Sequence, residues 1–456
     1  MKLRILFFFA SFQLIGQSFY DTRTAISSPL LFKTGNSRED DFFSLSYSVG
    51  SIFNSKKIAE KFTMNNKPYF TLNEQGATTT SEYVLADMNP LMIGLTDHTV
   101  GLLANGSYRG SIELFPKLIN QELLVHFYKQ FQKFFIDARS ALKICRSGIE
   151  IVETSQSLGA HAGLETFAHA MQNEKWLYGK MGMLKKKCGI DNIQIKIGKN
   201  NIFYSESESE NKPLVSHYIL LEIPTGKGTK SEWVFEPRVG KNHLAFGLGS
   251  DISWGDKKGQ LFLSGDIRYF LGAQETRSFD TIKNGSWSRY LPTVFIPSST
   301  GIHKSRSGIN FFTRTATVFP GAQIICSFRW AKEWNDLNIE CGSHFFCKSK
   351  ERISNVADYK DTFGIYDIYS NNGQTASSLT INSLKPASEI SQIESLTSDL
   401  DIESAISQIQ VVTGIGLKLE KIKDDTHFGL GAIIEIGHSE SAYSSWNVYL
   451  HSKFVF

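Results

Sequence analysis

The 456-residue sequence lacks long apolar segments. After the first eighteen residues no uninterrupted apolar run reaches eighteen residues, close to the minimum for a transmembrane helix. The mature chain is therefore expected to have no membrane-spanning helix. If it lies in a membrane it must do so as a closed barrel, because lipid cannot solvate the open edges of a sheet.

Patterns typical of several kinds of ligand site are also missing. The net charge of +3 is too small to indicate a nucleic-acid partner. No CxxC or Cys/His spacing indicates a metal site, and no cofactor is predicted. The segment GKGTKS at Gly226–Ser231 lacks the GxxxxGKS/T spacing of a phosphate loop and is interpreted as a turn.

Signs of catalysis are equally sparse. Outer-membrane phospholipases and proteases use His with Ser or Asp. The histidines along this chain are scattered singly, without a recurring Ser or Asp partner spacing. The chain is therefore not expected to be an enzyme. The histidines that stand alone in this way include His126, His169, His217, His243, His344 and His438.

Five cysteines are present, and an odd number leaves at least one thiol unpaired. Cys145 and Cys188 bracket a segment without strand character and are candidates to clamp its base. Cys326 is a candidate partner of Cys341 or Cys347. The favoured interpretation is that the cysteines are buried or lipid-facing thiols.

The first eighteen residues have the organisation of a secretory signal peptide. Two basic residues precede an apolar stretch over Ile5–Ile15, and small residues at Gly16 and Ser18 suit cleavage before Phe19. The stretch is too short to cross a bilayer. Residues 19–40 are mixed and polar and are predicted to form an N-terminal lead-in.

The stretch Ala442–Phe456 carries the clearest structural signal. Every second residue back from the end is mostly apolar or aromatic, and the interleaved residues are mostly polar, which predicts a strand with one apolar and one polar face. The stretch resembles the closing strand of bacterial outer-membrane barrels, whose C-terminal Phe and alternating apolar residues form an assembly signal. The matching residues are Phe456, Phe454, Leu450 and Val448, with Ser452 interrupting the row. An edge strand of a soluble β-sandwich is the alternative.

Similar alternation predicts strands from Asp41 onward. Leu118–Phe131 and Phe134–Cys145 are predicted to form a hairpin, but apolar residues at helical spacing keep a long amphipathic helix open as the alternative. The other predicted strands are Asp41–Asn54, Gly189–Gly198, Leu214–Ile223, Gly247–Trp254, Gln260–Leu271, Gly308–Phe319, Ala322–Lys332, Leu337–Lys348, Val411–Glu420 and Phe428–Gly437.

Four segments interrupt this pattern. They are 55–115, where Pro90–Ser107 is predicted to fold inward as a plug or constriction; 155–187, a helical insertion with a helix at Gly163–Trp176; Gly272–Ser305, a long polar loop; and 349–410, a mobile polar surface loop with a weak helix. Bacterial single-chain barrels have an even number of strands, so one further strand is placed at Glu232–Val239. The predicted fold is all-β: a transmembrane antiparallel up-and-down barrel over residues 41–456, with about fourteen strands (roughly 12–16), the helical insertion and long extracellular loops.

A second resemblance involves the middle of the chain. GIDNIQIKIG, IPTGKG and VGKNHLAFGLG follow one another as a strand, a PTG turn and a Gly-rich strand. This order resembles outer-membrane barrels related to the long-chain fatty-acid transporters and the aromatic-degradation porin-like family, together with uncharacterised relatives. The matching positions are Asp191, Pro224, Thr225, Gly226, Gly240, Gly247 and Gly249.

The resemblance implies a barrel with an internal plug that passes small, often hydrophobic, molecules. The chain departs from the fatty-acid transporters in lacking their Asn-Pro-Ala hatch motif near the mature start. Its nearest sequence is Asn89-Pro90-Leu91. The substrate class therefore stays open.

Charged residues on inward rows are the candidate pore-facing residues: Asp137, Arg139, Lys143, Asp266 and Arg268. Charges facing a pore select ions or polar solutes. The equal alternative is that they form interstrand ion pairs across a filled lumen. An apolar plug around Met92–Leu103 would instead favour hydrophobic cargo.

The predicted function is a porin-like channel or passive transporter for small molecules in the outer membrane of a Gram-negative-type bacterium, after cleavage near Ser18. A non-conducting structural or surface-interaction barrel acting through its long loops is the alternative, and a soluble secreted β-protein is a third hypothesis. The expected partners are outer-membrane lipid, the barrel-assembly machinery at the C-terminal strand and a small-molecule solute. Nucleic acid is not expected, and no interface signature indicates an oligomeric state.

Overall fold

The computed structural model describes residues 41–63, 67–73, 108–157, 166–202, 213–226, 228–256, 259–282, 286–290, 292–295, 304–357, 363–365, 391–393, 400–423, 425–439 and 441–456. The predicted signal peptide, the lead-in at 19–40 and the predicted plug at Pro90–Ser107 lie outside these residues. No helix in the described part of the chain is long and apolar enough to cross a bilayer.

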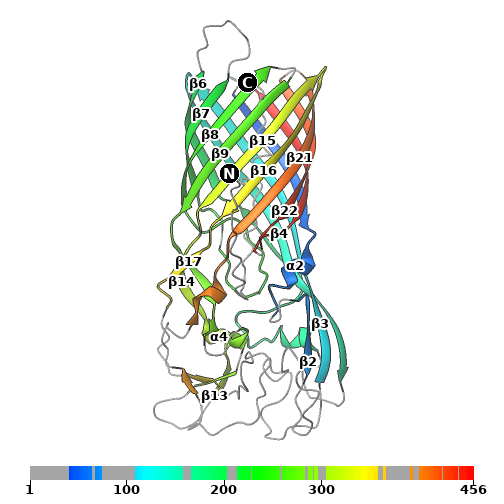
Figure 1. Ribbon diagram of the computed structural model, residues 1–456, viewed down its shortest axis with the longest axis vertical. Helices are drawn as coiled ribbons and strands as arrows, with labels where there is room; N and C mark the ends of the chain where they lie inside the picture. Colours follow the sequence, from blue (N-terminus) through cyan, green and yellow to red (C-terminus); the bar gives the residue numbers. More distant parts are fainter. Residues whose placement is uncertain are drawn as a thin grey trace, which may run out of the picture.

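Twelve antiparallel strands close into a barrel, drawn in the upper half of Figure 1. They follow one another around the wall in chain order: β1 (Phe42–Ile52), β3 (Tyr108–Phe131), β4 (Phe134–Ser157), β6 (Ile193–Ile202), β7 (Leu214–Ile223), β8 (Ala245–Asp256), β9 (Gly259–Phe270), β15 (Gln323–Trp334), β16 (Leu337–Lys348), β21 (Gln410–Lys423), β22 (Thr426–Gly437) and β23 (Ser445–Val455). Pairing of β1 with both β3 and β23 closes the sheet. The all-β class and the antiparallel barrel are confirmed, with twelve wall strands instead of about fourteen.

The hairpin β3–β4 is the longest element of the fold. Its register runs without a break from Tyr108 opposite Ser157 to Phe131 opposite Phe134. The predicted strands are therefore confirmed here, and the helical alternative is wrong. Alternation is continuous along both strands, so the two-residue period outweighs the apolar residues that also recur at helical spacing.

The two arms of this hairpin extend beyond the barrel. Two further strands that are not part of the closed wall pair with these extensions: β2 (Tyr69–Asn73) with β3, and β5 (Lys185–Ile190) with β4. They bring the whole sheet to fourteen strands. The extended hairpin runs down one side of the molecule at the lower right of Figure 1.

The two ends of the barrel differ in their connections. At one end the hairpins β3–β4, β15–β16 and β21–β22 turn within two residues. Gln132 and Asn335 adopt positive φ angles of 54° and 55° in two of these turns. Phe456 N donates to Asp41 O at 3.1 Å at this end, so both described ends of the chain lie there. Long connections leave the other end, an asymmetry typical of outer-membrane barrels.

The long connections build a folded cap. It contains α2 (Ser55–Ala59), α3 (Phe167–Ala170), η5 (Ser288–Tyr290), α4 (Ile309–Phe312) and η9 (Ile402–Ala405). Its strands are β10 (Ala273–Ser278), β11 (Asp280–Thr281), β12 (Pro292–Phe295), β13 (Lys304–Ser307), β14 (Thr313–Phe319), β17 (Arg352–Ser354), β18 (Phe363–Ile365), β19 (Ser391–Ile393) and β20 (Leu400–Asp401). They form sheets of three, two and four strands apart from the wall.

The cap has its own hydrophobic core. Phe70 packs against Phe167 and Trp287, with ring centroids 5.3 and 6.0 Å apart, and Trp287 packs against Tyr290 at 5.1 Å. Further buried members come from all the long connections: Phe62, Met171, Val234, Phe279, Ile309, Phe312, Leu400 and Tyr443. The segments predicted as long polar loops at 272–305 and 349–410 thus contribute strands and core residues wherever the structure describes them.

Several local predictions are wrong. Glu232–Val239 forms no strand, and in the described part of the helix predicted at Gly163–Trp176, residues 166–176, the helix is the four-residue α3. The predicted wall strand Gly308–Phe319 divides into α4 and β14, and β14 pairs with β10 and β17 in the cap. Residues 313–319 do alternate, but alternation does not specify which sheet a strand joins.

All five cysteines are free thiols. Cys145 is buried, and Cys188, Cys326 and Cys341 are exposed on the outer face. The candidate partners Cys145 and Cys188 are not bonded to each other, nor is Cys326 bonded to Cys341 or Cys347.

Candidate functional site: the inner wall of the barrel

The barrel wall has an apolar outer face. Alternate residues on every wall strand point outward, and large hydrophobic side chains there are 36–72% exposed. They include Leu123, Phe127, Ile136, Leu142, Ile197, Ile219, Leu248, Ile267, Phe328, Ile415, Leu417, Leu430, Ile434, Leu450 and Val448. An exposed apolar surface of this extent is not a stable boundary with water.

The inner face of the same wall is charged. Eight basic and seven acidic side chains are buried on the inward rows of the described wall strands. They are Arg139, Lys143, Lys196, Arg268, Arg329, Lys348, Lys418 and Lys453, and Glu122, Asp137, Glu222, Asp266, Glu340, Glu420 and Glu435. The two signs nearly cancel, so the inner wall carries little net charge.

The structure places all five sequence-predicted pore-facing residues on this inner face, and each is ion-paired. Arg139 Nε donates to Asp137 Oδ1 at 2.8 Å, and His126 Nε2 lies 3.1 Å from the same oxygen. Lys143, which is fully buried, lies 3.1 Å from Glu122 Oε1. These pairs lie within a strand or across the β3–β4 hairpin.

The second predicted pair also joins a larger cluster. Arg268 Nε donates to Asp266 Oδ1 at 2.6 Å, and its Nη1 donates to Glu222 Oε2 at 3.3 Å. The Glu222 carboxylate in turn accepts from Asn192 Nδ2 at 2.8 Å. The predicted residues are thus paired both within a strand and between strands: Asp137–Arg139 and Asp266–Arg268 within one strand, and Lys143–Glu122 and Arg268–Glu222 between strands.

A third cluster was not predicted from the sequence. Glu340 on β16 accepts from Arg329 Nη1 at 2.9 Å, from Lys418 Nζ at 3.1 Å and from Asn338 Nδ2 at 3.1 Å. Arg329, Glu340 and Lys418 all occupy inward positions of predicted strands. Their meeting depends on cross-strand register, which the alternation does not reveal.

Inward glycines let aromatic rings lie flat along the wall. In four directly opposed cross-strand pairs a ring covers a glycine: Phe135 and Gly198, Tyr218 and Gly249, His344 and Gly414, and Tyr449 and Gly431. A Cβ added at any of these glycines would lie 2.2–2.5 Å from a ring atom. The pairing keeps four rings against the wall.

We expect Gly431→Ala to lower the free energy of unfolding by about 1–3 kcal/mol, because its Cβ would overlap the Tyr449 ring. Thermal and denaturant unfolding of the refolded protein in detergent would measure the loss. Gly265→Ala is the matched control, since the nearest atom to its added Cβ is 3.9 Å away. Equal losses for both variants would contradict the steric explanation.

One Ser-His-carboxylate set lies on the inner wall. Ser46 Oγ is 2.7 Å from His451 Nδ1, and His451 Nε2 is 3.7 Å from Glu420 Oε1. The second distance is too long for a hydrogen bond. Ser46 and His451 are 2% and 4% exposed, so a substrate has no access to the hydroxyl. The arrangement does not support catalysis.

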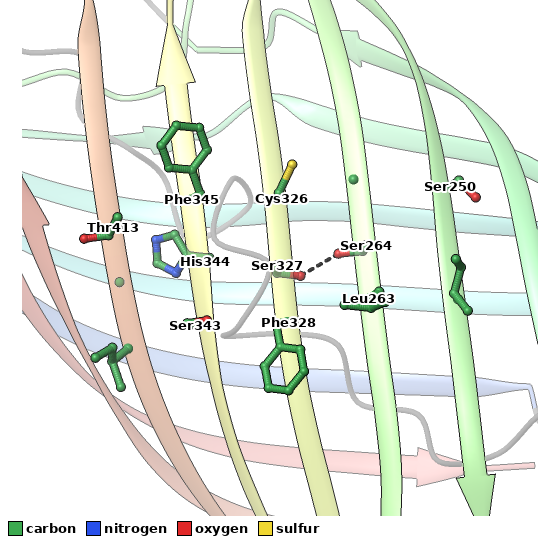
Figure 2. A pocket seen from close by; sticks show the side chains of 14 residues that line it. Ser250, Leu263, Ser264, Cys326, Ser327, Phe328, Ser343, His344, Phe345 and Thr413 are labelled. Atoms are coloured by element: carbon green, nitrogen blue, oxygen red, sulfur yellow. Dashed lines mark hydrogen bonds between the residues drawn. The ribbon is translucent and has the colours of Figure 1, made fainter. Parts of the chain in front are cut away.

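A depression lies in the outer wall, across β8, β9, β15, β16 and β21 (Figure 2). It has a volume of 660 Å³. Cys326, Phe345 and Thr413 in its lining are exposed, whereas the neighbouring His344 is buried toward the lumen. The lining contains no carboxylate, lysine or arginine, so the depression suits an apolar chain better than a polar solute.

Four positions of the PTG resemblance, Asp191, Thr225, Gly226 and Gly240, meet at the barrel rim facing the cap, whereas Gly247 and Gly249 lie within β8. Thr225 Oγ1 donates to Asp191 O at 2.5 Å, and Lys241 N donates to Asn192 Oδ1 at 3.0 Å. Gly240 has a φ of 71° and approaches Gly226 so closely that a Cβ on it would lie 2.8 Å from the Gly226 Cα. These motif positions build a rim junction with no ligand-binding group of their own.

The ionic junction, defined here as Arg238, His243, Glu275, Arg277, Lys348 and Glu351, joins the cap to the wall. Glu275 accepts from Arg277 Nη2 at 2.6 Å and from Arg238 Nη2 at 3.2 Å. Burial raises the pKa of Glu275, but the guanidinium groups of Arg277 and Arg238 outweigh it and hold the pKa well below its usual value of 4.5. Glu351 links Lys348 of β16 to Arg277 at 3.0 and 3.4 Å.

No group of three or more His, Cys, Asp or Glu side chains in the described part of the chain is arranged to hold a metal ion.

Comparison with known proteins assigns no family. No family model and no curated protein matches the chain. An outer-membrane channel from Pseudomonas putida F1 is similar in structure, with a TM-score of 0.41 and 9% identity over 93% of this chain and 100% of that one. The transport unit of the autotransporter AIDA-I from Escherichia coli gives 0.32 and 8% over 94% and 95%. The monoaromatic hydrocarbon channel CymD gives 0.30 and 8% over 92% and 89%. Likeness this weak assigns neither a family nor a substrate.

Proposed function

We propose that the protein is an outer-membrane β-barrel that passes small molecules through its lumen, as a porin-like channel or passive transporter. The observation that carries this proposal is the two-sided wall, apolar outside and charged inside. A soluble protein would bury the apolar rows, whereas a barrel in lipid exposes them and turns its polar rows toward a wet lumen. This observation supports a membrane barrel over the soluble secreted β-protein.

The size of the barrel supports passage. Side chains just fill the interior of an eight-stranded barrel, and the interior widens with each added strand. A twelve-stranded barrel therefore encloses more space than an eight-stranded one. Because basic and acidic inward residues nearly balance, we expect the pore to show little preference between small cations and anions.

The row of β23 that carries Val448, Leu450 and Phe454 faces outward, and Phe456 is 66% exposed. This orientation leaves the row available to lipid and to the barrel-assembly machinery, which we propose as its partners.

A non-conducting surface-interaction barrel is the second candidate, and the cap favours it. A set of loops that only bordered a pore would not need a buried core, yet Trp287 in the cap is 1% exposed. On this hypothesis the cap is the binding surface, and the ion pairs on the inner wall keep the lumen closed.

Planar-bilayer recording of the refolded mature protein separates the two. We expect discrete conductance steps from the wild type and larger or more frequent steps from Trp287→Ala, which loosens the cap core at a cost of about 3–5 kcal/mol. Ile282→Ala, at an exposed cap position, is the control and should behave as the wild type. A folded barrel that never conducts, with or without Trp287, would overturn the channel and favour the surface-interaction barrel.

A further inference from the structure

Two basic side chains lie directly opposite each other on the outside of the long hairpin. Arg146 of β4 pairs in register with Lys186 of β5, and both are exposed. Like charges directly opposed in a sheet repel and destabilise it. Neither side chain has an ion-pair partner among the residues that the structure describes. An external anion between them would relieve the repulsion.

The neighbouring cations are already occupied. Lys185 and Lys187 face the other side of β5, where Lys185 Nζ lies 4.0 Å from the Trp233 ring centroid and Lys187 Nζ donates to Gly228 O at 2.9 Å. On the outer face, Lys117 forms an ion pair with Glu150. Arg146 and Lys186 thus differ from these nearby cations, each of which already contacts a protein group.

Apolar side chains border this pair on both sides. Toward the barrel, the next outward rows are Ile144 opposite Cys188 and Leu142 opposite Ile190, and Leu142 and Ile190 are about half exposed. Away from the barrel, Met183 and Leu184 are 74% and 44% exposed. Cations bordered by exposed apolar residues at the edge of an apolar wall suit the interface between lipid headgroups and acyl chains.

We propose that Arg146 and Lys186 bind the phosphate of an anionic membrane lipid, whose acyl chains lie along Leu142 and Ile190. This inference rests on the proposed membrane location. The two positive charges favour a phosphate group as the ligand. The apolar row that continues toward the barrel favours a lipid phosphate over a soluble anion.

The test compares lipid binding by the full mature chain and by Arg146→Gln/Lys186→Gln. Dissociation constants would be measured by native mass spectrometry from detergent, with phosphatidylglycerol and with phosphatidylcholine of the same acyl chains. We expect the wild type to prefer phosphatidylglycerol and the double variant to bind it about 30-fold more weakly, at roughly 1 kcal/mol for each cation. Lys117→Gln is the matched control, an ion-paired cation on the same outer face, and should keep the wild-type affinity.

Several outcomes overturn the proposal. They are equal binding of the two lipids, an unchanged affinity in the double variant, or competition by inorganic phosphate alone, which would mean a soluble-anion site. Arg146→Lys/Lys186→Arg retains both charges and should retain binding, which separates charge from damage to the fold. Flotation of the wild type with vesicles is measured in parallel. Failure to float would overturn the membrane location itself, whereas flotation without lipid preference would overturn only this site.

Discussion

Replacing Glu340 with leucine should lower the free energy of unfolding by about 3–5 kcal/mol, the cost of removing one partner from a buried ion pair. Glu340 is the acceptor shared by Arg329 and Lys418, and all three are buried on the inner wall. Without it, the Arg329 guanidinium loses its carboxylate partner while it stays 4% exposed. Denaturant unfolding of the barrel in detergent, followed by tryptophan fluorescence, would measure the change.

Two further variants test the cause. Arg329→Met/Glu340→Leu removes both charges and should regain most of the loss, because Lys418 still lies 3.2 Å from Glu420. Glu150→Gln breaks the exposed pair with Lys117 and should cost less than about 1 kcal/mol. If the double variant is as unstable as Glu340→Leu, the packing of the leucine side chain and not the unpaired Arg329 charge is responsible.

Acid should detach the cap from the wall before it opens the barrel. The pKa of Glu275 is held well below 4.5 in the folded protein, and the pKa of Glu351 is also lowered, because burial is outweighed by Lys348 and Arg277. Carboxylates with lowered pKa values stabilise the fold fully above their unfolded pKa. That contribution is lost as the pH falls through the folded values. Cap stability should therefore be constant from pH 7 to about pH 5 and fall below about pH 4.

Limited digestion as a function of pH, with a neutral protease at pH 5–7 and an acid-active protease below about pH 5, would detect the loosened cap. Glu275→Gln should lower the free energy of cap opening by about 3–5 kcal/mol, so the cap should be protease-sensitive already at pH 7. The further loss of cap stability in acid should then be smaller than in the wild type. Glu403→Gln is the control, because the Lys350–Glu403 pair is about half exposed and should contribute less than about 1 kcal/mol. A cap that loosens between pH 7 and 5 would contradict the assignment to these two carboxylates.

The wall could be predicted from the sequence because a period of two encodes which face each residue takes. Asp137 and Arg139 alternate with Ile136 and Ala138, and the structure places the charged pair inward and Ile136 outward. The alternation does not predict which inward residues contact each other across strands. Which inward residue meets Glu340 depends on the register of three strands, and that register depends on turn geometry.

The cap could not be predicted for a related reason. Its strands have two to seven residues and pair across long sequence separations, as when Asp280 pairs with Asp401. The shortest of these strands cannot show a periodic pattern, and the alternation of β14 does not specify its partners. Trp287, in a segment interpreted as a polar loop, is buried against Phe70 of β2 and the nearby Tyr290. Its burial is a property of the assembled cap.

Closure of the sheet by β1 and β23 has a consequence for the order of assembly. These two strands are separated by most of the chain, yet they pair over eleven positions from Phe42 opposite Val455 to Ile52 opposite Ser445. Every other wall contact joins strands that follow one another along the barrel, so this pairing has the greatest chain entropy to overcome. Until it forms, the intermediate is a curved sheet with two unsatisfied edges, neither of which lipid can solvate. Insertion therefore needs either simultaneous closure or a temporary strand that occupies the seam until β1 and β23 meet.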